Sequence, residues 1–424
     1  MAMKMKDSGI EWIGEIPEDW ETTRIGSLYS LRNTKVSDID YPPLSVTMNG
    51  ILPQLETAAK TNDHNNRKLV KKDDFVINSR SDRRGSCGIS KYDGSVSLIN
   101  IVLSPNETMN PEYYNWVFTN PSFSDEFYKW GNGIVDDLRT TNWSKMKNID
   151  VPHPNLEVQE KITYYLNNKI SSIDYLLIKI NDEIEKLENY KKSLITEAVT
   201  KGLDKNVEMK DSGIEWIGEI PKHWIKSKVK HACSLIGSGT TPASHNLDFY
   251  SDDGINWIQS GDLYKTNEII TTEKNITEMA IKAYPILKIY ESPYLVMAMY
   301  GASVGNLSIS KIDAATNQAC CVMKTNNRTN LFYLYYWLLF VKDDFLRKAE
   351  GGSQPNISQD KIKNQIMYFP PILEQDAIVN YLNKKTKLID QTISLKQKQL
   401  QSLEEYKKSL IYEYVTGKKE VLNA

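Results

Sequence analysis

The sequence contains little cysteine. Its 424 residues include four, Cys87, Cys233, Cys320 and Cys321, and none belongs to a C-x-x-C pair. The five histidines show no metal-ligand spacing with them. A disulfide framework or a structural zinc site would need paired spacings of that kind. The sequence therefore predicts free thiols in a reducing compartment and no metal site.

An excess of either charge is also absent. The chain has 52 Lys and Arg against 54 Asp and Glu, which excludes a uniformly basic nucleic-acid coat but not a local basic surface. The most apolar run, Leu331–Val341, is far shorter than the roughly 20 residues that cross a bilayer. Met1–Gly14 has no apolar signal-peptide core. We expect a cytoplasmic protein.

The motifs of the common catalytic sites are missing too. There is no G-x-x-x-x-G-K-[ST], H-E-x-x-H or G-x-S-x-G. YPPL at Tyr41 and FPPI at Phe369 lack the first-position Asn or Asp of adenine amino-methyltransferases. GASVG at Gly301–Gly305 lacks the third glycine of a dinucleotide fingerprint. We predict a chain without catalytic residues or bound cofactor, with a self-contained methyltransferase or nuclease as the enzymatic alternative.

What the sequence does contain is a long internal repeat. KDSGIEWIGEIP at Lys6–Pro17 recurs letter for letter at Lys210–Pro221, an offset of 204 residues. Trp20 and Trp224 keep the same offset. Twelve identical residues in a row indicate that the chain is two half-chains in tandem, each beginning with this opening motif.

A second repeat closes each half-chain. Tyr165–Gly202 matches Tyr381–Lys418 at an offset of 216, and YKKSLI is common to both. Each copy follows a proline-containing junction, PNLEVQ at Pro154–Gln159 and PPILEQ at Pro370–Gln375. The offset grows by 216 − 204 = 12 residues, so the second body is longer by that amount. Because the bodies between the repeats hardly resemble each other, we expect one scaffold that presents two different recognition surfaces.

The closing repeats carry heptads of apolar residues, which are typical of coiled coils. A lysine, Lys191 or Lys407, occupies the same seam position in each copy and can fix the register at a cost in stability. The predicted seam consists of Ile173, Leu177, Ile180, Ile184, Leu187 and Leu194 in the first helix and Ile389, Ile393, Leu400, Leu403 and Leu410 in the second.

We predict that these two helices pack on each other as an antiparallel coiled coil, a rod of roughly 60 Å. Equivalent helices in an antiparallel pair imply a pseudo-two-fold axis. The alternative is that each helix packs on its own body as an ordinary surface helix. The first arrangement predicts that the end of the second helix, Val415–Gly417, lies near the first opening motif at Asp7–Trp12.

The first body, about residues 18–153, and the second, about 222–369, predict α+β domains with a sheet and flanking helices. Strands are expected at Asp73–Asn78 and Ser95–Leu103, with helix over Pro111–Trp130. In the second body GINWIQ, SPYLVMAMY and QACCVMK are strand candidates, and LFYLYYWLLFVKDDFLRKAE is the expected helix. Because Phe75–Ser79 and Leu295–Met299 occupy comparable positions, we expect one fold for both bodies. The predicted domains are 1–155, 156–203, 204–371 and 372–424.

The first body contains a basic stretch, Arg67–Lys91, with eight Lys or Arg and three Asp, a net charge of 8 − 3 = +5. Its arginines stand in a Ser/Asp/Gly-rich turn, and arginine is the side chain best suited to bidentate contact with guanine. A second polar loop, Leu138–Lys145, precedes the junction. A solvated charged loop is the alternative reading. The DNA-binding candidates in this body are Arg80, Arg83, Arg84, Lys91, Arg139, Thr140, Asn142 and Lys145.

The second body offers polar groups at comparable places. GSGTTPAS at Gly237–Ser244 exposes backbone amides but lacks the lysine of a P-loop. GGSQPNISQDKIK at Gly351–Lys363 precedes the junction, as Leu138–Lys145 does in the first body. Groups of this kind bind phosphates and base edges and are equally common in plain turns. The candidates are Ser238, Thr240, Thr241, Tyr300, Ser303, Ser353, Gln354 and Asn356.

Taken together, the repeated opening motif, the P-x-L-x-x-Q or PPILEQ junction and the long helix with YKKSLI resemble the specificity subunit of Type I restriction-modification enzymes. The second body adds GINWIQSGDL, GASVG, TNQA and GSQPNIS, which are similar to the target-recognition domains of that family. The first body departs from the pattern, with SDRRGSCG in place of YGASVG and VDDLRTTNWS in place of GGSQPNIS.

The resemblance implies a subunit that recognises a bipartite double-stranded DNA target, with the helices as a ruler and half-sites about one helical turn, roughly 34 Å, apart. It implies two methyltransferase (M) subunits that bind S-adenosylmethionine and methylate adenine N6, and motor-nuclease (R) subunits that use ATP and Mg. Other possibilities are a recognition module of another defence assembly, an orphan recognition subunit, and a coiled-coil scaffold that binds only protein.

Overall fold

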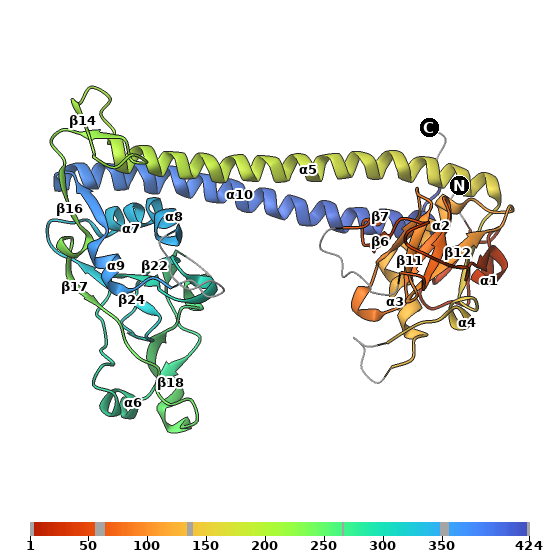
Figure 1. The fold of residues 1–424 in the computed structure, drawn as a ribbon, viewed down its shortest axis with the longest axis horizontal. Coiled ribbons are helices and arrows are strands. Elements are labelled where there is room, and N and C mark those ends of the chain that lie inside the picture. Colours follow the sequence, from red (N-terminus) through yellow and green to blue (C-terminus); the bar gives the residue numbers. More distant parts are fainter. Residues whose placement is uncertain (1–3, 56–63, 134–138, 265–266, 348–355, 422–424) are drawn as a thin grey trace. The chain divides into compact units, whose positions relative to one another are not determined.

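The structure is a computed structural model that describes residues 4–55, 64–133, 139–264, 267–347 and 356–421 (Figure 1). Its contacts divide the chain into two compact units. Unit 1 comprises residues 1–182 and 396–424, and unit 2 comprises residues 183–395. Each unit contains one body and parts of both long helices. The domain boundaries drawn from the sequence stay a prediction, since the contacts group whole units and divide the two helices between them.

Unit 1 is built mainly of short strands, with helices after the sheet. The strands are β1 (Met5–Asp7), β2 (Glu15–Pro17), β3 (Glu21–Arg24), β4 (Tyr29–Leu31), β5 (Lys35–Val36), β6 (Leu44–Thr47), β7 (Gly50–Pro53), β8 (Arg67–Val70), β9 (Phe75–Asn78), β10 (Cys87–Ile89), β11 (Gly94–Ser97), β12 (Asn100–Pro105) and β13 (Asp150–His153). The helices are α1 (Ile25–Leu28), the 3-10 turn η1 (Ser81–Arg83), α2 (Pro111–Phe118), α3 (Pro121–Lys129), α4 (Trp143–Met146) and the start of α5 (Leu156–Lys201).

Unit 2 repeats this order with additions. Its strands are β14 (Met209–Asp211), β15 (Glu219–Pro221), β16 (Ile225–Lys228), β17 (Cys233–Gly237), β18 (Tyr250–Ile258), β19 (Glu268–Ile269), β20 (Asn275–Ile276), β21 (Tyr294–Ala298), β22 (Leu307–Ser310), β23 (Ala315–Thr316), β24 (Cys320–Thr325) and β25 (Ile366–Phe369). Its helices are η3 (Val229–His231), η4 (Leu247–Phe249), η5 (Asp262–Tyr264), α6 (Glu278–Ala283), η6 (Gly301–Ser303), α7 (Leu331–Phe340), α8 (Lys342–Arg347), α9 (Gln359–Asn364) and α10 (Ile372–Val415).

The central sheets of the two units have the same strand order. It is β4-β12-β9-β10 in unit 1 and β17-β24-β21-β22 in unit 2, where β19 adds a parallel edge strand. The predicted equivalence of Phe75–Ser79 and Leu295–Met299 is confirmed, because β9 and β21 occupy the same place in these sheets. The second body differs by the segment with β18 and α6, which lies on the side of the sheet away from α7 (Figure 1). The α+β prediction is thus correct for both bodies.

The first helix after each sheet begins in the same way. Asn110 caps α2 by accepting hydrogen bonds from the backbone of Glu112 and Tyr113, and Asn330 caps α7 in the same manner. The helix expected over Pro111–Trp130 is present as two helices, α2 and α3. The chain breaks it at Asn120, which caps α3 immediately before Pro121.

The glutamine of each junction motif has a structural role. The side-chain carbonyl of Gln159 accepts a hydrogen bond of 2.9 Å from the backbone N–H of Asn110, and its amide donates to Pro154 O. Gln375 makes the same pair of bonds with Asn330 and Pro370. Both glutamines are buried. The junction therefore fastens the first helix of the body to the start of the long helix.

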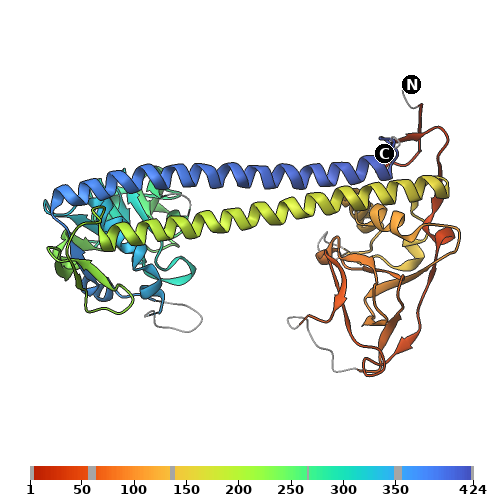
Figure 2. The ribbon, with the colours of Figure 1, turned by 90° about the horizontal axis from the view of Figure 1, so that it is seen from above.

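The long helices α5 and α10 lie side by side within each unit, as Figures 1 and 2 show. In unit 1, Tyr165 packs on Tyr414 with ring centroids 4.5 Å apart, and Asp174 meets Lys407. Residue numbers rise along α5 as they fall along α10, so the helices are antiparallel, as predicted. None of the predicted seam residues is exposed. Ile173, Ile180, Leu194, Ile389 and Leu410 are buried, and Leu177, Ile184, Leu187, Ile393, Leu400 and Leu403 are half-buried.

The seam lysines pair with a repeated aspartate. In unit 2, Lys191 Nζ lies 2.7 Å from Asp390 Oδ1, and in unit 1 Lys407 Nζ lies 2.5 Å from Asp174 Oδ1. Lys191 and Lys407 are equivalent residues of the two repeats, and so are Asp174 and Asp390. Each half-chain therefore supplies the lysine of one pair and the aspartate of the other.

Reversing one of these pairs should have a small, local effect. Lys191→Glu places two carboxylates together and should destabilise unit 2 by about 1 kcal/mol, the usual scale for a partly exposed pair. Adding Asp390→Lys should restore most of the loss. Hydrogen exchange of the α5 and α10 amides in unit 2 measures both changes, and the untouched Lys407–Asp174 pair is the internal control. Equal protection in the single and double variants would contradict the assignment.

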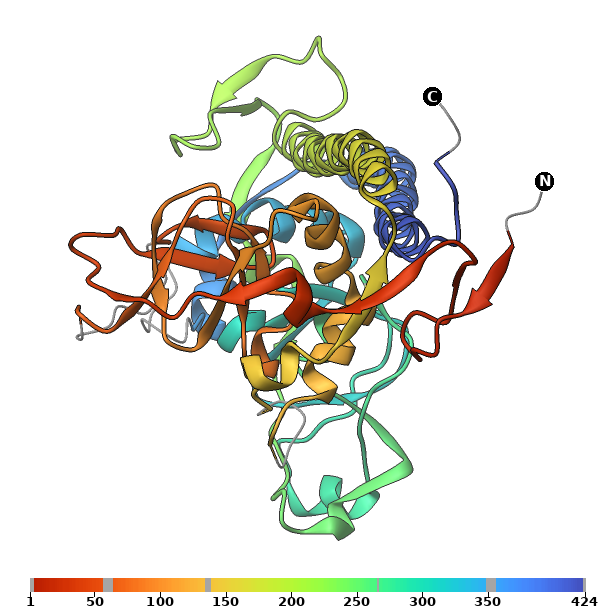
Figure 3. The same cartoon turned by 90° about the vertical axis from the view of Figure 1, so that its right-hand side faces the viewer.

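The end of α10 returns to the first opening motif. The Tyr412 hydroxyl donates to Ile13 O at 3.1 Å, and Lys418 Nζ donates to Ile13 O at 2.7 Å and Glu15 O at 2.9 Å. Gly417, with φ of +71°, leaves the helix against Pro17 and Trp20, where a Cβ would lie 2.4 Å from the proline ring. The predicted closure of the chain is confirmed, and Figures 2 and 3 show the blue end of α10 beside the red β1–β2 segment.

The largest hydrophobic core of each unit includes residues of both long helices. In unit 1, Leu166 and Ile170 of α5 and Leu410 and Val415 of α10 are buried with the aromatic residues of α2 and α3. The Tyr113 hydroxyl donates to Val415 O at 2.8 Å, a contact between residues 302 positions apart. Unit 2 uses the other ends, with Val199 of α5 and Leu382 of α10 in its core. The alternative in which each helix packs only on its own body is therefore wrong.

Candidate nucleic-acid interface

The central strand β9 ends in a tight polar turn at Ser79–Ser86, called here turn 1. The backbone of Asn78 donates to Ser86 O at 2.9 Å and closes the turn. Within it, Arg83 N donates to Arg80 O, and Ser86 N donates to Arg83 O. Gly85 has φ of +74°, a conformation that favours glycine. These bonds hold the turn in one shape.

Turn 2, Met299–Asn306, follows the equivalent strand β21 and has the same backbone in its second half, whereas Gly301, with φ of +72°, differs from its equivalent Ser81. Val304 has φ −50° and ψ 131°, and Arg84 of turn 1 has φ −50° and ψ 136°. Gly305 has φ of +78°. SDRRGS and GASVGN share only the glycine that this φ requires and differ elsewhere. The departure of the first body from the second in this motif is therefore one of side chains and not of fold.

In each unit the predicted second loop joins the turn. Arg80 forms a β-bridge with Thr140, and Ser81 Oγ accepts a hydrogen bond of 2.9 Å from the backbone of Arg139. In unit 2, Tyr300 forms the equivalent bridge with Asn356. The two loops of each unit are far apart in the sequence, and the fold brings them together at one end of each sheet. Ser353 and Gln354 lie outside the described residues.

The arginines of turn 1 differ in their partners. Arg80 Nε lies 3.1 Å from Asp82, and Arg84 Nη1 lies 2.7 Å from Asp125. The Arg84 guanidinium also lies over the Tyr128 ring, 5.6 Å from its centroid. Arg83 is exposed, and its side chain has no hydrogen bond or ion pair with any part of the chain that the structure describes. Turn 1 thus presents two tethered guanidinium groups and one that projects into solvent.

Two of the other candidates in unit 1 have bonds of their own. Asn142 is the N-cap of α4, and its side-chain carbonyl accepts from Lys145 N and from the Ser144 hydroxyl. Its amide nitrogen is exposed with the residue. Thr140 is exposed, and the Lys145 side chain is half-buried.

Lys91 lies at the other end of the sheet. β9 and β10 are antiparallel, with Cys87 opposite Ile77 and Ile89 opposite Phe75, so the chain beyond Ile89 has moved away from turn 1. The structure therefore does not bring Lys91 together with Arg80, Arg83 and Arg84, and its DNA-binding role stays a prediction.

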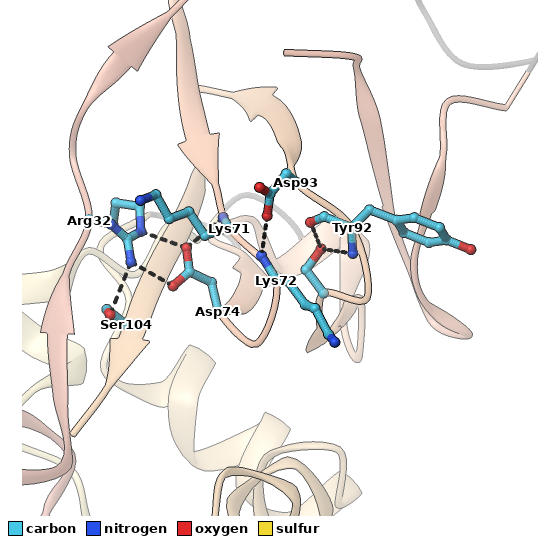
Figure 4. Close-up of polar contacts among 8 residues, drawn as sticks. Arg32, Lys71, Lys72, Asp74, Tyr92, Asp93 and Ser104 are labelled. Carbon is cyan, nitrogen blue, oxygen red and sulfur yellow. Dashed lines mark hydrogen bonds and ion pairs between the residues drawn. The ribbon is translucent and has the colours of Figure 1, made fainter. Parts of the chain in front are cut away.

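The basic stretch is further divided by structural ion pairs and hydrogen bonds. Figure 4 shows Arg32 reaching Asp74, with Nε 2.6 Å and Nη2 3.0 Å from its carboxylate. Arg67 is buried and donates to Ser95, and burial lowers its pKa. Lys68 donates to Asn100 O at 2.7 Å. The net charge of +5 is therefore not one continuous basic surface.

In unit 2 the candidates at the start of the body meet turn 2 at the same end of the sheet. β17 runs beside β24, whose first residue Cys320 pairs with Ala298. The Thr241 hydroxyl donates to the side chain of Gln318 at 2.6 Å, and Ser238 O accepts from Tyr290. Thr240 is half-buried. A Cβ at Gly239 would lie 1.8 Å from Thr316 O, so glycine is required for this approach.

Turn 2 itself exposes Tyr300 and buries Ser303. Tyr300 is 38% exposed, whereas Ser303 is 4% exposed and its hydroxyl donates to Tyr300 O at 3.1 Å. Ser303 occupies the place of Arg83 in turn 1. The predicted role of Ser303 as a surface contact is wrong, because a small side chain at this position folds back into the turn. Asn356 is exposed beside Tyr300.

Two residues near the turns were missed by the sequence reasoning. Met48, 77% exposed, stands at the tip of the β6–β7 hairpin, and its Cε would lie 3.8 Å from a Cβ at Gly85. The Asn-Gly pair that follows it is the sequence signal of a hairpin turn. Lys342 lies against Gly305, donates to Asn306 Oδ1 at 2.9 Å and is half-buried, which lowers its pKa. Nothing in the sequence indicated that contact.

The four cysteines are free, as expected. Burial raises the pKa of the Cys87 and Cys321 thiols to about 12, so both are protonated near neutral pH. Among the residues that the structure describes, no group of three or more His, Cys, Asp or Glu is arranged to hold a metal ion. In the same residues, no helix combines the length and the apolar character needed to cross a membrane.

The two α+β bodies share one fold. Each presents a polar turn that is bridged to a second loop, and the side chains of the two turns differ. This arrangement defines a duplicated binding protein. The type I restriction modification DNA specificity domain matches residues 17–186 and again residues 221–405. These matches cover most of the chain, and the protein belongs to this family. Its role is to provide DNA sequence specificity in a type I restriction-modification system.

Relatives of similar length support this assignment. The chain is 24% identical to the type I restriction enzyme MjaX specificity subunit of Methanocaldococcus jannaschii, over 96% of this chain and 95% of the relative. It is also 24% identical to the EcoR124I/EcoR124II specificity subunit of Escherichia coli, over 73% and 72% of the two chains.

Solved structures share the fold. A chain from a study of complex assembly and conformational transition of the type I R-M system has a TM-score of 0.72 at 13% identity, covering 94% of this chain and 98% of that one. The HsdS subunit from Thermoanaerobacter tengcongensis has a TM-score of 0.51 at 14% identity, covering 95% and 98%.

Proposed function

We propose that each unit reads one half of a bipartite DNA target, unit 1 through turn 1 and unit 2 through turn 2. The observation that carries this proposal is that the two turns stand at the same place in one fold and share the backbone of their second halves, but have different side chains. One scaffold that presents Arg80, Arg83 and Arg84 in one copy and Tyr300 in the other is suited to two unlike half-sites. Because α5 and α10 each contribute to both units, helix length is the natural determinant of the spacing between half-sites.

In this proposal the chain supplies only the recognition of the DNA sequence. Methyltransferase subunits bind S-adenosylmethionine and methylate adenine N6, and motor-nuclease subunits use ATP and Mg to restrict unmodified DNA. The catalytic motifs missing from the sequence are those that such partners must carry. Similarity to specificity subunits, and to a chain from a study of type I R-M complex assembly, supports partners of this kind.

The test is the DNA methylation pattern of the chain reconstituted with its methyltransferase subunits. Arg83→Ala combined with Arg84→Ala should relax or abolish reading of one half-site and leave the other half-site unchanged. A loss of one bidentate contact weakens binding about 10-fold to 100-fold. Because at least one of the removed charges faces DNA, the dependence of binding on salt should also become less steep.

Lys91→Ala is the matched control. It removes an exposed positive charge from the same unit, but at the opposite end of the sheet. It should leave the methylation pattern unchanged. A double arginine variant with the wild-type pattern, or an equal defect in Lys91→Ala, would remove turn 1 from the interface.

A further inference from the structure

We infer that Arg83 reads a guanine in the half-site bound by unit 1, while Arg80 and Arg84 are positioning residues that hold turn 1. This inference rests on the proposed function and assigns one chemical group to it. The first observation is the difference in partners. Arg80 is paired with Asp82, and Arg84 with Asp125, whereas the Arg83 side chain has no partner among the described residues.

The charges of turn 1 also single out Arg83. Turn 1 contains three arginines, and the carboxylates of Asp82 and Asp125 lie against two of them, Arg80 and Arg84. Because each aspartate neutralises a different flanking arginine, Arg83 is the arginine of turn 1 whose charge no described carboxylate neutralises. A guanidinium engaged with a carboxylate must break that pair before it can bind a base, and Arg83 has no such pair with a residue that the structure describes.

The backbone at Arg83 is already fixed. Its N–H donates to Arg80 O at 3.1 Å, and its carbonyl accepts from Ser86 N at 3.1 Å and from the Tyr128 hydroxyl at 3.5 Å. Tyr128 is a buried core residue, so the turn is anchored to the core of unit 1. A reading side chain on such a support loses less conformational entropy when it binds, because only its own rotamers must be ordered.

The chemistry of the group selects the base. Arginine has donors in a planar fork and no acceptor, and guanine is the base with two acceptors, O6 and N7, on its major-groove edge. Adenine and cytosine both present an amino donor there. At the equivalent place in turn 2, the small hydroxyl of Ser303 is buried and bonded within the turn. The inference therefore predicts arginine reading through this turn in one half-site only.

The experiment uses the chain with its methyltransferase subunits and duplexes carrying the target found by methylation mapping. Each guanine of each half-site is replaced in turn by 7-deazaguanine, which removes the N7 acceptor and keeps base pairing. The wild type should bind one substituted duplex about 10-fold to 100-fold more weakly. Arg83→Ala should weaken binding to the normal duplex to the same degree and show no further loss with 7-deazaguanine at that position.

Two matched variants separate reading from positioning. Arg80→Ala and Arg84→Ala should bind more weakly overall but keep the sensitivity to 7-deazaguanine at that position. The inference is overturned if Arg83→Ala keeps full sensitivity at every guanine, if the wild type is insensitive at all of them, or if the half-site altered by turn 1 variants contains no guanine. Failure of the proposed function is a different result, in which the reconstituted wild type has no preferred sequence at all.

Discussion

Leu410→Ala should unfold the sheet of unit 1 although residue 410 lies more than 300 positions from most of that sheet. Leu410 is 2% exposed and belongs to the core that contains Tyr113 and Ile170. Removing a buried leucine side chain costs about 2–5 kcal/mol, because transfer free energy is lost and a cavity remains. A loss of that size is a large part of the stability of an ordinary domain.

Hydrogen exchange resolved by segment is the appropriate measurement, because a chain of two units is not expected to unfold in one step. Amides of β9 and β12 should lose protection, and those of β21 and β24 should keep it. Leu403→Ala, at a half-buried seam position of the same helix, is the control and should have a smaller effect. Equal loss of protection in the two sheets would show that Leu410 does not act through the core of unit 1.

Arg32→Met should destabilise unit 1 by about 3–5 kcal/mol, the usual effect of removing one partner from a buried ion pair. Asp74 is 1% exposed, and its carboxylate accepts both Arg32 nitrogens as well as Lys71 N at 2.8 Å (Figure 4). Without the guanidinium, a charged carboxylate stays buried beside apolar strands. The pairing with Asp74 also raises the pKa of Arg32, which keeps the arginine charged at any ordinary pH.

Arg84→Met is the matched control, because it breaks a pair with Asp125 whose side chains are 46% and 71% exposed. Exposed pairs contribute about 0–1 kcal/mol, so this variant should unfold nearly as the wild type does. Arg32→Met with Asp74→Asn should recover part of the loss by removing the unpaired charge. Thermal unfolding of unit 1 at equal ionic strength compares Arg32→Met, Arg84→Met and the double variant. A loss for Arg84→Met equal to that for Arg32→Met would contradict the role of burial.

How well an element could be predicted from the sequence depended on how many residues its sequence pattern spans. The heptads predicted the helices and their buried faces, because helical periodicity is local and repeats many times. Short apolar runs were less informative. Ser95–Leu103 was expected to be one strand and is two, β11 and β12, with Leu98 and Ile99 exposed at the turn between them. An apolar pair in a turn leaves no periodic signal from which the break could be found.

The site was predicted in part for a related reason. The loops that carry Arg83 and Thr140 were identified, since Gly, Ser and charged residues mark turns locally. Which arginine lacks a partner among the described residues could not be predicted, because Asp82 is two positions from its partner Arg80 and Asp125 is forty-one positions from its partner Arg84. The same holds for Ser303, whose burial follows from the path of the whole turn.

The sequence by itself determined the duplication, the seam of the long helices and the family of the protein. These three properties follow from the identity of distant segments and from helical periodicity. Both can be found without knowing the tertiary contacts. Only the tertiary structure decided that the largest core of each unit takes residues from both long helices, that turns 1 and 2 share the backbone of their second halves, and that Lys91 lies at the other end of the sheet from Arg83. The physical reason is that contacts of this kind join residues tens to hundreds of positions apart, and strand register, which no local pattern encodes, sets which of them meet.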